Sequence, residues 1–546
     1  MDCIFQMYRN IIGRAKESSE TFINSLETHC SAKAISISMI IFLLTFAGFA
    51  GLTSNAFING DTAVYAHQIA HLDFAHRTIH LAYYMIGALF TWLIPGSNDY
   101  ALNLMNCLFG ALSISLIYLM AFTIFQKHII ATISSLFLVT NYFFIVNSLY
   151  AEIYILQVFF LLLALQCWLL NKPIAAGLAF TLSILVTPSS ILAIPCFVIL
   201  RPQKKALLRL GLTLLILLAI ALLPRLDEYL FGNRGLLSVS RQVNVGITAV
   251  KEGYEVIFGL FLYIPFILSG ITEVAKQKKL QVFGIAILSL WILNFLIIDR
   301  FRDVPAQLPF YALLCLIGGL GFSRSVYFMT TKTIDKVAMK DLWLLSCTAL
   351  VMISLQGIAI KIGKTPAQIS LTHISLFLPI SLFALVALYA VIVTLMVKIF
   401  GRVKLIYSSA ILAMLILFVG ANSYLSFTLV SKLKHELTEF RSSALEVERV
   451  AQSDYLVVGD WSQGILFEHY VFGKFETGYW INTECLLSDS RDSPKCEESI
   501  KKWQNSIVSG KEIWLLGDYP SLVSDLRTSG YTVRPSKNIY RATVQN

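Results

Sequence analysis

Residues 59–80 read NGDTAVYAHQIAHLDFAHRTIH and directly follow the first long apolar run of the chain. Four of the nine histidines and two aspartates lie in this one stretch of an otherwise apolar sequence. These residue types allow three interpretations: a metal site, a catalytic carboxylate with neighbouring hydrogen-bonding groups, or a solvated loop.

The histidines match a metal site only in part. His67 and His71 are four residues apart, which aligns them on one face of a helix. The segment HQIAH lacks the glutamate of the H-E-x-x-H zinc signature, so the base that this chemistry requires is missing. His76 and His80 repeat the spacing without an acid between them. Histidines on an amphipathic interfacial helix are the competing explanation.

Two carboxylates could supply a catalytic base. Asp61 follows Gly60 within ten residues of the end of the first apolar run, and Glu152, in SLYAEIY, lies where a later run begins. A carboxylate at the edge of the hydrocarbon region is partly desolvated, which makes it a stronger proton acceptor. Charges at membrane depth are costly and indicate function by default. The alternative is that both acids are solvated interfacial residues.

A basic segment later in the chain, DRFRDVPAQLPF (299–310), could bind a phosphate. Arg300 and Arg302 precede an apolar run, and guanidinium groups bind phosphate oxygens bidentately. Arg241, in residues 224–255, could contribute a further cation. The alternative is that these arginines only anchor a helix end at the interface.

The elements that must position these groups are membrane-spanning helices. The 546 residues are 56% hydrophobic and 14% charged, against about 25% charged residues in soluble domains. Continuous apolar runs of roughly 17–25 residues recur from Ile35 to Val430, and each can cross the ~30 Å hydrocarbon core as a helix. The sequence therefore predicts an α-helical polytopic membrane protein whose first run is a retained anchor, not a cleaved signal peptide.

The net charge of +10 indicates how the chain is oriented in the membrane, and we do not expect a nucleic-acid partner. The cations form short clusters between apolar runs, as in cytoplasmic loops. This pattern predicts a cytoplasmic segment 1–34, about 13 transmembrane helices within 35–430, and a large first external loop, 53–100. We expect a bacterial inner or plasma membrane, with the active site and the C-terminus extracytoplasmic.

Two regions leave the span count open. Residues 80–94 could cross the membrane or lie on its surface, and residues 174–200 could be one span or a pair broken at residues 187–190. The choices are linked because the basic cluster Arg201–Arg209 must stay inside. A surface helix with a broken pair is favoured.

After Val430 the composition becomes polar, and residues 431–546 are predicted to form a small extracytoplasmic α/β domain. YLVVGDW (455–461) and IWLLGDY (513–519) each end an apolar run in Gly-Asp before a helix-like pattern, which is typical of a parallel sheet. Cys485 and Cys496 could form a disulfide outside the cytoplasm, but their spacing alone leaves the pairing open.

These elements, in this order, resemble the GT-C superfamily of membrane glycosyltransferases, in the branch of protein O-mannosyltransferases and lipid A aminoarabinose transferases. The resemblance covers roughly residues 35–325 and departs from the family where Ile79-His80-Leu81 replaces His-Pro-Pro. The segments that carry it are GD (60–61), HLAYY (80–84), ALNLMNCLFGALSISLIYLMAFTIF (101–125), AEIY (151–154), LSILVTPSSILAIP (182–195) and RFRDVPAQLPFYALLCLIGGLG (300–321).

The resemblance implies a GT-C fold and an inverting enzyme of cell-envelope glycosylation. Such an enzyme transfers a hexosyl or pentosyl sugar from a polyprenyl-phosphate donor to a hydroxyl of a lipid, glycan or protein acceptor. No Asp-x-Asp begins at Asp61, so no cofactor is expected and a divalent metal, though open, is not favoured. The roles implied are Asp61 as general base with Glu152 orienting it or the acceptor, Arg300, Arg302 and Arg241 as donor-phosphate ligands, and His80, Tyr83 and Tyr65 as substrate contacts.

Three other classes compete with this interpretation. An O-antigen polymerase or ligase also acts on lipid-linked glycans, but it relies on a long late external loop with paired arginines and usually lacks a terminal α/β domain. A polytopic transporter would bury ionisable residues within its spans and could show inverted repeats, and neither is evident in this sequence. An inactive relative that serves as an assembly partner is also open.

Overall fold

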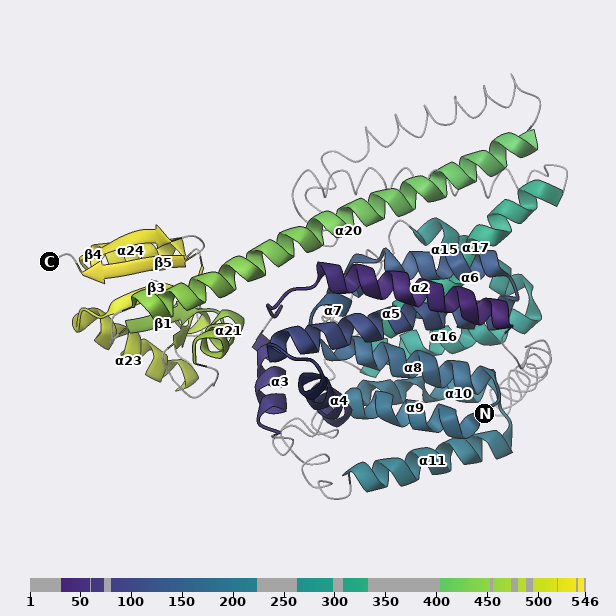
Figure 1. Ribbon diagram of the computed structural model, residues 1–546, viewed down its shortest axis with the longest axis horizontal. Helices are drawn as coiled ribbons and strands as arrows, with labels where there is room; N and C mark the ends of the chain where they lie inside the picture. Colours follow the sequence, from purple (N-terminus) through teal and green to yellow (C-terminus); the bar gives the residue numbers. More distant parts are fainter. Residues whose placement is uncertain are drawn as a thin grey trace, which may run out of the picture.

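The computed structural model describes residues 31–58, 60–72, 80–222, 263–297, 308–331, 403–451, 455–472, 480–487, 494–517, 519–536 and 539–544. It consists mostly of helices, which form a bundle from the apolar runs, and of a small sheet domain at the C-terminal end (Figure 1).

The bundle helices follow the predicted apolar runs. α2 (Ala32–Leu52) and α5 (Asn98–Phe125) begin after Ser31 and Ser97, whose side chains each accept a backbone N–H of the first turn. The other described helices before α20 are α3 (Gly60–Ala70), α4 (Leu81–Leu93), α6 (His128–Val139), α7 (Tyr142–Leu149), α8 (Ile153–Leu169), α9 (Pro173–Val186), η2 (Pro188–Ala193), α10 (Ile194–Leu200), α11 (Lys204–Leu222), α15 (Ile264–Lys276), α16 (Lys278–Ile297) and α17 (Leu308–Thr331).

Two apolar segments are broken. α6 and α7 meet at an angle of 67°, and the Asn141 side chain caps the start of α7. α9 ends at Val186 and the chain continues through the 3-10 turn η2, so the predicted break at residues 187–190 is confirmed. Pro188 explains the break, because proline has no N–H to continue the helix and disfavours helical backbone in the preceding residue.

The described residues contain two helices, α2 and α5, that are long and apolar enough to cross a membrane, or three spans if the bent pair α6–α7 counts as one. α4, α8 and α9 are apolar but shorter. The apolar runs at 342–360 and 374–397, which are two of the about 13 expected spans, lie outside the described residues. The expected 13 spans, the side that each loop faces and the surface position of α4 therefore stay predictions.

α20 (Val403–Val450) is a single helix of 48 residues that runs from the bundle to the sheet domain (Figure 1, green). Val430 packs in the core of the bundle, whereas Ala444 and Val447 pack against the sheet. The change of composition after Val430 therefore lies inside a helix. It marks a change in what surrounds the helix, and the sheet begins only at Tyr455.

The C-terminal domain holds a five-stranded sheet in the order β2-β1-β3-β5-β4. The predicted strands at 455 and 513 form a parallel pair, and β2 is parallel to β1. An antiparallel hairpin of β4 and β5, which was not predicted, completes the sheet. The strands are β1 (Tyr455–Gly459), β2 (Trp480–Asn482), β3 (Glu512–Leu515), β4 (Tyr531–Ser536) and β5 (Ile539–Val544).

Helices cover both faces of this sheet. Leu456 and Val458 of β1 pack with α23 (Pro494–Val508) and α24 (Pro520–Thr528). Val457 points to the opposite face, because side chains alternate along a strand, and packs with α20 and α21 (Trp461–Phe472). α21 is therefore on the same side of the sheet as the helix that comes from the bundle.

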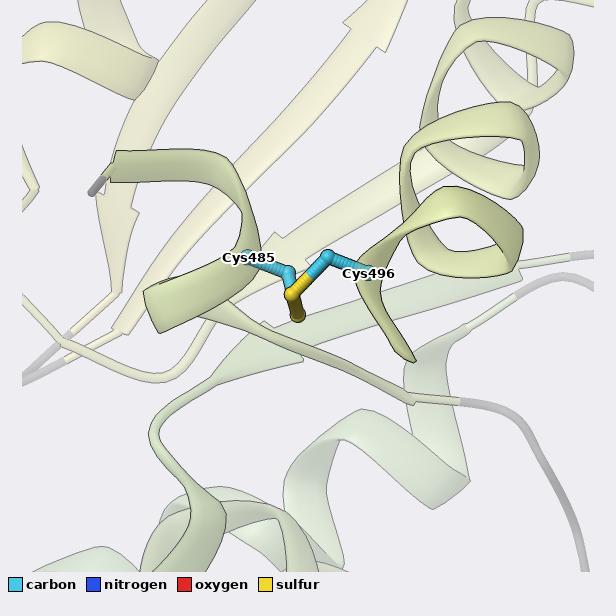
Figure 2. Close-up of a disulfide and its surroundings, with 2 residues drawn as sticks. All are labelled: Cys485 and Cys496. Atoms are coloured by element: carbon cyan, nitrogen blue, oxygen red, sulfur yellow. A yellow bond between two sulfur atoms is a disulfide. The ribbon is translucent and has the colours of Figure 1, made fainter. Parts of the chain in front are cut away.

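Cys485 and Cys496 form a disulfide with an S–S distance of 2.03 Å and a Cα–Cα distance of 5.1 Å (Figure 2). The bond joins the short helix α22 (Thr483–Leu487) to the start of α23. The pairing that spacing alone left open is thus present in the structure. The extracytoplasmic location of the domain stays a prediction.

Candidate active site

Asp61 lies in the first turn of α3 and is half-buried. The N-terminus of a helix carries a partial positive charge, which stabilises a carboxylate in the first turn. The helix itself is anchored, because most of its side chains are buried, including Thr62, Ala63, Tyr65, Ala66 and Ile69. The structure thus places the predicted base at the accessible end of a fixed helix.

Tyr65, one turn along α3 from Asp61, lies at the centre of an aromatic cluster. The centroid of its ring lies 5.7 Å from that of His80, 5.5 Å from that of Tyr83 and 6.1 Å from that of Tyr84, all edge to face. Edge-to-face contacts are a favoured geometry of aromatic pairs. The three predicted substrate contacts, His80, Tyr83 and Tyr65, therefore lie together.

The break after α9 fixes His80. Its Nδ1 lies 2.6 Å from the backbone carbonyl oxygen of Val186, the last residue of α9. The last carbonyls of a helix lack a partner within the helix, and a carbonyl can only accept. Nδ1 therefore carries the proton in this contact, and the helix break positions a residue of the site.

Glu152 reaches the same cluster from the extended chain between α7 and α8, where it is only 7% exposed. Burial raises the pKa of Tyr65 well above its ordinary value, and the carboxylates of Glu152 and then Asp61 raise it further. Glu152 also interacts electrostatically with the Tyr83 hydroxyl group. Both carboxylates therefore contribute to the electrostatic environment of the Tyr65 phenol.

A buried asparagine of α5 holds the segment that carries Glu152. The side-chain amide of Asn106 donates to the backbone carbonyl oxygens of Tyr150 and Glu152, each at 2.7 Å, and to that of Asn147 at 3.1 Å. These carbonyls lie at the end of α7 and just beyond it, where intrahelical donors are missing. Asn106 therefore sets the path of the chain into α8.

Asn103 holds the chain on the other side of the site. Its Nδ2 donates to the carbonyl oxygens of Ser54 and Ala56, at 2.8 and 3.0 Å, and its Oδ1 accepts from the Ala151 N–H at 2.7 Å. One side chain thus joins the segment before α3 to the segment before α8. The signal that could have found Asn103 and Asn106 is their spacing of three in an apolar run, which places them on one helix face.

The C-terminal domain also contacts the chain that leads to Asp61. The Gly60 N–H donates to Ser462 Oγ at 2.8 Å, and the Phe57 N–H donates to the Tyr470 hydroxyl at 2.9 Å. Ser462 and Tyr470 belong to α21. No local pattern predicts these bonds, because the partners are 402 and 413 positions apart.

The predicted phosphate ligands Arg241, Arg300 and Arg302 lie outside the described residues. Within them, Lys434 of α20 brings a cation to the start of the loop before Asp61. Its Nζ donates to the carbonyl oxygen of Thr53 at 2.9 Å.

An apolar cavity of about 380 Å³ ends near the same place. It reaches Leu52, the residue before Thr53, and Val430, one turn from Lys434. The lining residues come from α2, from α6 and α7 with the bend between them, and from α20: Leu44, Thr45, Gly48, Phe49, Leu52, Val139, Thr140, Ile145, Ser423, Ser426, Phe427 and Val430. The cavity thus runs along α2 to its last residue, Leu52, beside the start of the loop that leads to α3.

His67, in α3, and His71, just after the end of this helix, lie beside each other. The ring centroids of His67 and His71 lie 4.3 Å apart, as the spacing of four predicts. In the described part of the chain, no three or more His, Cys, Asp and Glu side chains are grouped so that they could hold a metal ion. Residues 73–79, which include His76, lie outside that part, so the expected absence of a metal stays a prediction.

Comparisons with known proteins bear on this arrangement. The family model of dolichyl-phosphate-mannose-protein mannosyltransferases matches residues 73–187, a range that includes His80, Tyr83 and Glu152. None of the curated proteins matches the sequence significantly.

The fold is similar to that of ArnT from Cupriavidus metallidurans in two crystal structures. With ArnT bound to undecaprenyl phosphate, the TM-score is 0.54 at 10% sequence identity, over 94% of this chain and 98% of ArnT. With the apo state, the TM-score is 0.55 at 10% identity, over 93% and 96% of the two chains. The resemblance seen in the sequence is thus supported by a family match to one branch and by a shared fold with the other. Residues 73–187 are thus similar to the mannosyltransferase family, and the chain as a whole shares its fold with ArnT.

Proposed function

We propose that the protein transfers a sugar from a polyprenyl-phosphate donor to an acceptor hydroxyl at the extracytoplasmic face of the membrane, with inversion at the anomeric carbon. The observation that carries the proposal is the convergence of Asp61, Glu152 and the Tyr65 cluster at one end of an apolar bundle. The similar ArnT structure contains undecaprenyl phosphate, and the matching family is named for a dolichyl-phosphate-mannose donor. Both are polyprenyl phosphates.

Asp61 acts as the general base in this proposal. The proton of the acceptor hydroxyl passes to the Asp61 carboxylate, the acceptor oxygen bonds to C1 of the sugar, and the bond from C1 to the phosphate oxygen breaks. A single displacement of this kind needs one carboxylate as base, whereas inverting hydrolases also need a carboxylic acid that protonates the leaving-group oxygen. The half-buried position of Asp61 in the first turn of α3 supports the assignment, because the acceptor must reach it.

The leaving polyprenyl phosphate gains negative charge, so it needs cations more than it needs a proton. We assign this role to Arg300, Arg302 and Arg241. Lys434 is a further cation beside the loop before Asp61. The isoprenoid chain then lies in the apolar cavity that ends at Leu52 and Val430, which would place its phosphate near Lys434.

Glu152 and the aromatic cluster position the substrates. Tyr65, Tyr83 and His80 offer apolar ring surface together with polar tips, a combination that suits a sugar ring with its hydroxyls. Glu152 orients the acceptor or Asp61 from the buried side of the cluster.

Release of the carrier lipid tests the proposal. Purified protein, supplied with labelled polyprenyl-phosphate hexose or pentose and a membrane extract as the source of acceptor, should release free polyprenyl phosphate. Asp61→Asn should reduce the rate by about 10²–10⁴-fold, the usual contribution of a general base, with an unchanged melting temperature. Asp525→Asn makes the same change at an exposed position of α24 and should leave the rate unchanged.

Three outcomes would contradict parts of the proposal. Full activity of Asp61→Asn would remove the role of Asp61 as base. No release by the wild-type protein from either lipid-linked sugar would contradict the transferase. Consumption of a lipid-linked glycan, with the polyprenyl-phosphate monosaccharides left intact, would indicate an O-antigen polymerase or ligase instead.

A further inference from the structure

Helix α21 of the C-terminal domain lies between the sheet and the bundle. Phe467 packs with Val457 and Trp514 in a core on one face of the sheet, whereas Leu466 belongs to the core of the bundle. Adjacent residues of a helix point about 100° apart, so α21 presents different faces to the two parts. α21 therefore forms part of both cores.

α21 also completes the N-terminus of the helix that carries Asp61. The first N–H groups of a helix have no intrahelical partner, and the side chain just before the helix is their usual acceptor. In α3 the N–H of Gly60, the residue before Asp61, donates to Ser462 Oγ at 2.8 Å. A cap of α3 is therefore supplied by another domain.

Two neighbouring residues of α21 hold the approach to α3. Tyr470 accepts from the Phe57 N–H at 2.9 Å, and burial raises the pKa of Tyr470, which keeps its hydroxyl protonated. The His469 ring lies 5.3 Å from that of Phe57, and its Nε2 lies 3.1 Å from Oδ1 of Asp99, in the first turn of α5. One face of α21 thus fixes Phe57, Gly60 and the start of α5 together.

We propose that Ser462 is a positioning residue for sugar transfer, which sets the orientation of the Asp61 carboxylate by capping α3 through Gly60. Tyr470 and His469 keep α21 in the register that this cap requires. The inference rests on the proposed function, in which Asp61 is the base. A base must come within about 2.6–3.2 Å of the heavy atom whose proton it removes, and a misplacement of about 1 Å can cost 10²-fold in rate. Ser462 therefore acts on the chemical step and leaves donor binding unchanged.

The test compares three variants by two measurements. Ser462→Ala removes the acceptor, Ser462→Thr keeps a hydroxyl, and Ser509→Ala removes an exposed hydroxyl of the same domain whose bond is local. Hydrogen–deuterium exchange of the peptide covering residues 57–66 reports on the cap without any assay of activity. Steady-state kinetics with the labelled donor separate kcat from the donor KM.

Ser462→Ala should raise exchange over residues 57–66 and lower kcat by about 10–100-fold, with the donor KM within twofold of wild type. Ser462→Thr should keep the exchange and kcat close to those of wild type. Ser509→Ala should match wild type in both exchange and kcat. Melting temperatures of the three variants should agree with that of wild type, which separates positioning from unfolding.

Unchanged exchange over residues 57–66 in Ser462→Ala overturns the inference whatever the activity. Raised exchange with a wild-type kcat, or a loss confined to the donor KM, also overturns it. A wild-type protein that transfers no sugar contradicts the proposed function instead, and its exchange data still decide whether Ser462 holds α3.

Discussion

The two acids of the candidate site are held by different parts of the molecule. Glu152 is 7% exposed, and Asn106 of the bundle helix α5 binds the carbonyls of its segment. Asp61 is half-buried, and α3 is capped by Ser462 of the C-terminal domain. The position of Glu152 therefore depends on the packing of the bundle, whereas that of Asp61 depends on an interface between two domains.

This difference matches the two proposed roles. A buried carboxylate is costly unless its surroundings are built for it, so a fixed position suits a group that orients others. A base must meet an incoming hydroxyl and later release its proton, which requires access. We infer that the bundle defines where the sugar is held, and that the C-terminal domain defines whether the base is in place.

The largest effects on rate are expected at the two acids, with a smaller loss at Glu152 than at Asp61. Glu152→Gln keeps the shape and removes the charge, so it should lower kcat by about 10–100-fold, as for a lost positioning contact, and by less than Asp61→Asn does. Rates of carrier release by both variants, measured side by side, show which of the two acids costs more when its charge is removed. Glu448→Gln, at an exposed position of α20, is the control. A loss at Glu152 equal to that at Asp61 would mean that the roles of the two acids are reversed or shared.

A smaller effect on rate, with a clear effect on stability, is expected at Asn106. Asn106→Ala leaves the carbonyls of Tyr150 and Glu152 without their side-chain donor, and a buried unsatisfied polar group costs about 1–3 kcal/mol. Thermal unfolding measures this cost. Ser113→Ala, which removes a buried hydroxyl of α5 bonded only within the helix, should cost less.

The change in rate tests whether Asn106 acts through Glu152. The rate losses of Asn106→Ala and Glu152→Gln should be non-additive in a double-mutant cycle, because they affect one interaction. Wild-type stability of Asn106→Ala, or fully additive losses, would contradict the role assigned to Asn106.

The parts of the molecule that could be predicted from the sequence are those with local signals. Continuous apolar runs predict the bundle helices, Pro188 predicts the break after α9, and the Gly-Asp motifs predict the parallel strands at 455 and 513. Asp61, Glu152, His80, Tyr83 and Tyr65 were proposed from motif order, and the structure brings them to one site.

The remaining features depend on contacts without a local signal. The cap of α3 by Ser462 joins residues 402 positions apart, so neither segment alone indicates it. The polar composition after Val430 indicates a new environment but does not show that α20 continues to Val450. Asn103 and Asn106 lie between these cases, because two asparagines in an apolar helix are visible in the sequence while their carbonyl partners are not.

The smallest effect concerns the Tyr65 phenol, which both acids influence. Burial raises its pKa most, Glu152 adds the next contribution and Asp61 a smaller one. The fold therefore favours the protonated phenol. The contribution of the Tyr65 phenol to stability is complete below its ordinary pKa of about 10. It is lost as pH rises from there towards the higher pKa of the folded state. One such group changes stability by at most about 1.4 kcal/mol per pH unit.

Melting temperatures between about pH 9 and pH 11 test whether the pKa of Tyr65 is raised in the folded protein. Tyr65→Phe should flatten the decline above pH 10, because the phenol that ionises on unfolding is gone. A decline above pH 10 that Tyr65→Phe leaves unchanged would contradict the burial of a protonated phenol at this position.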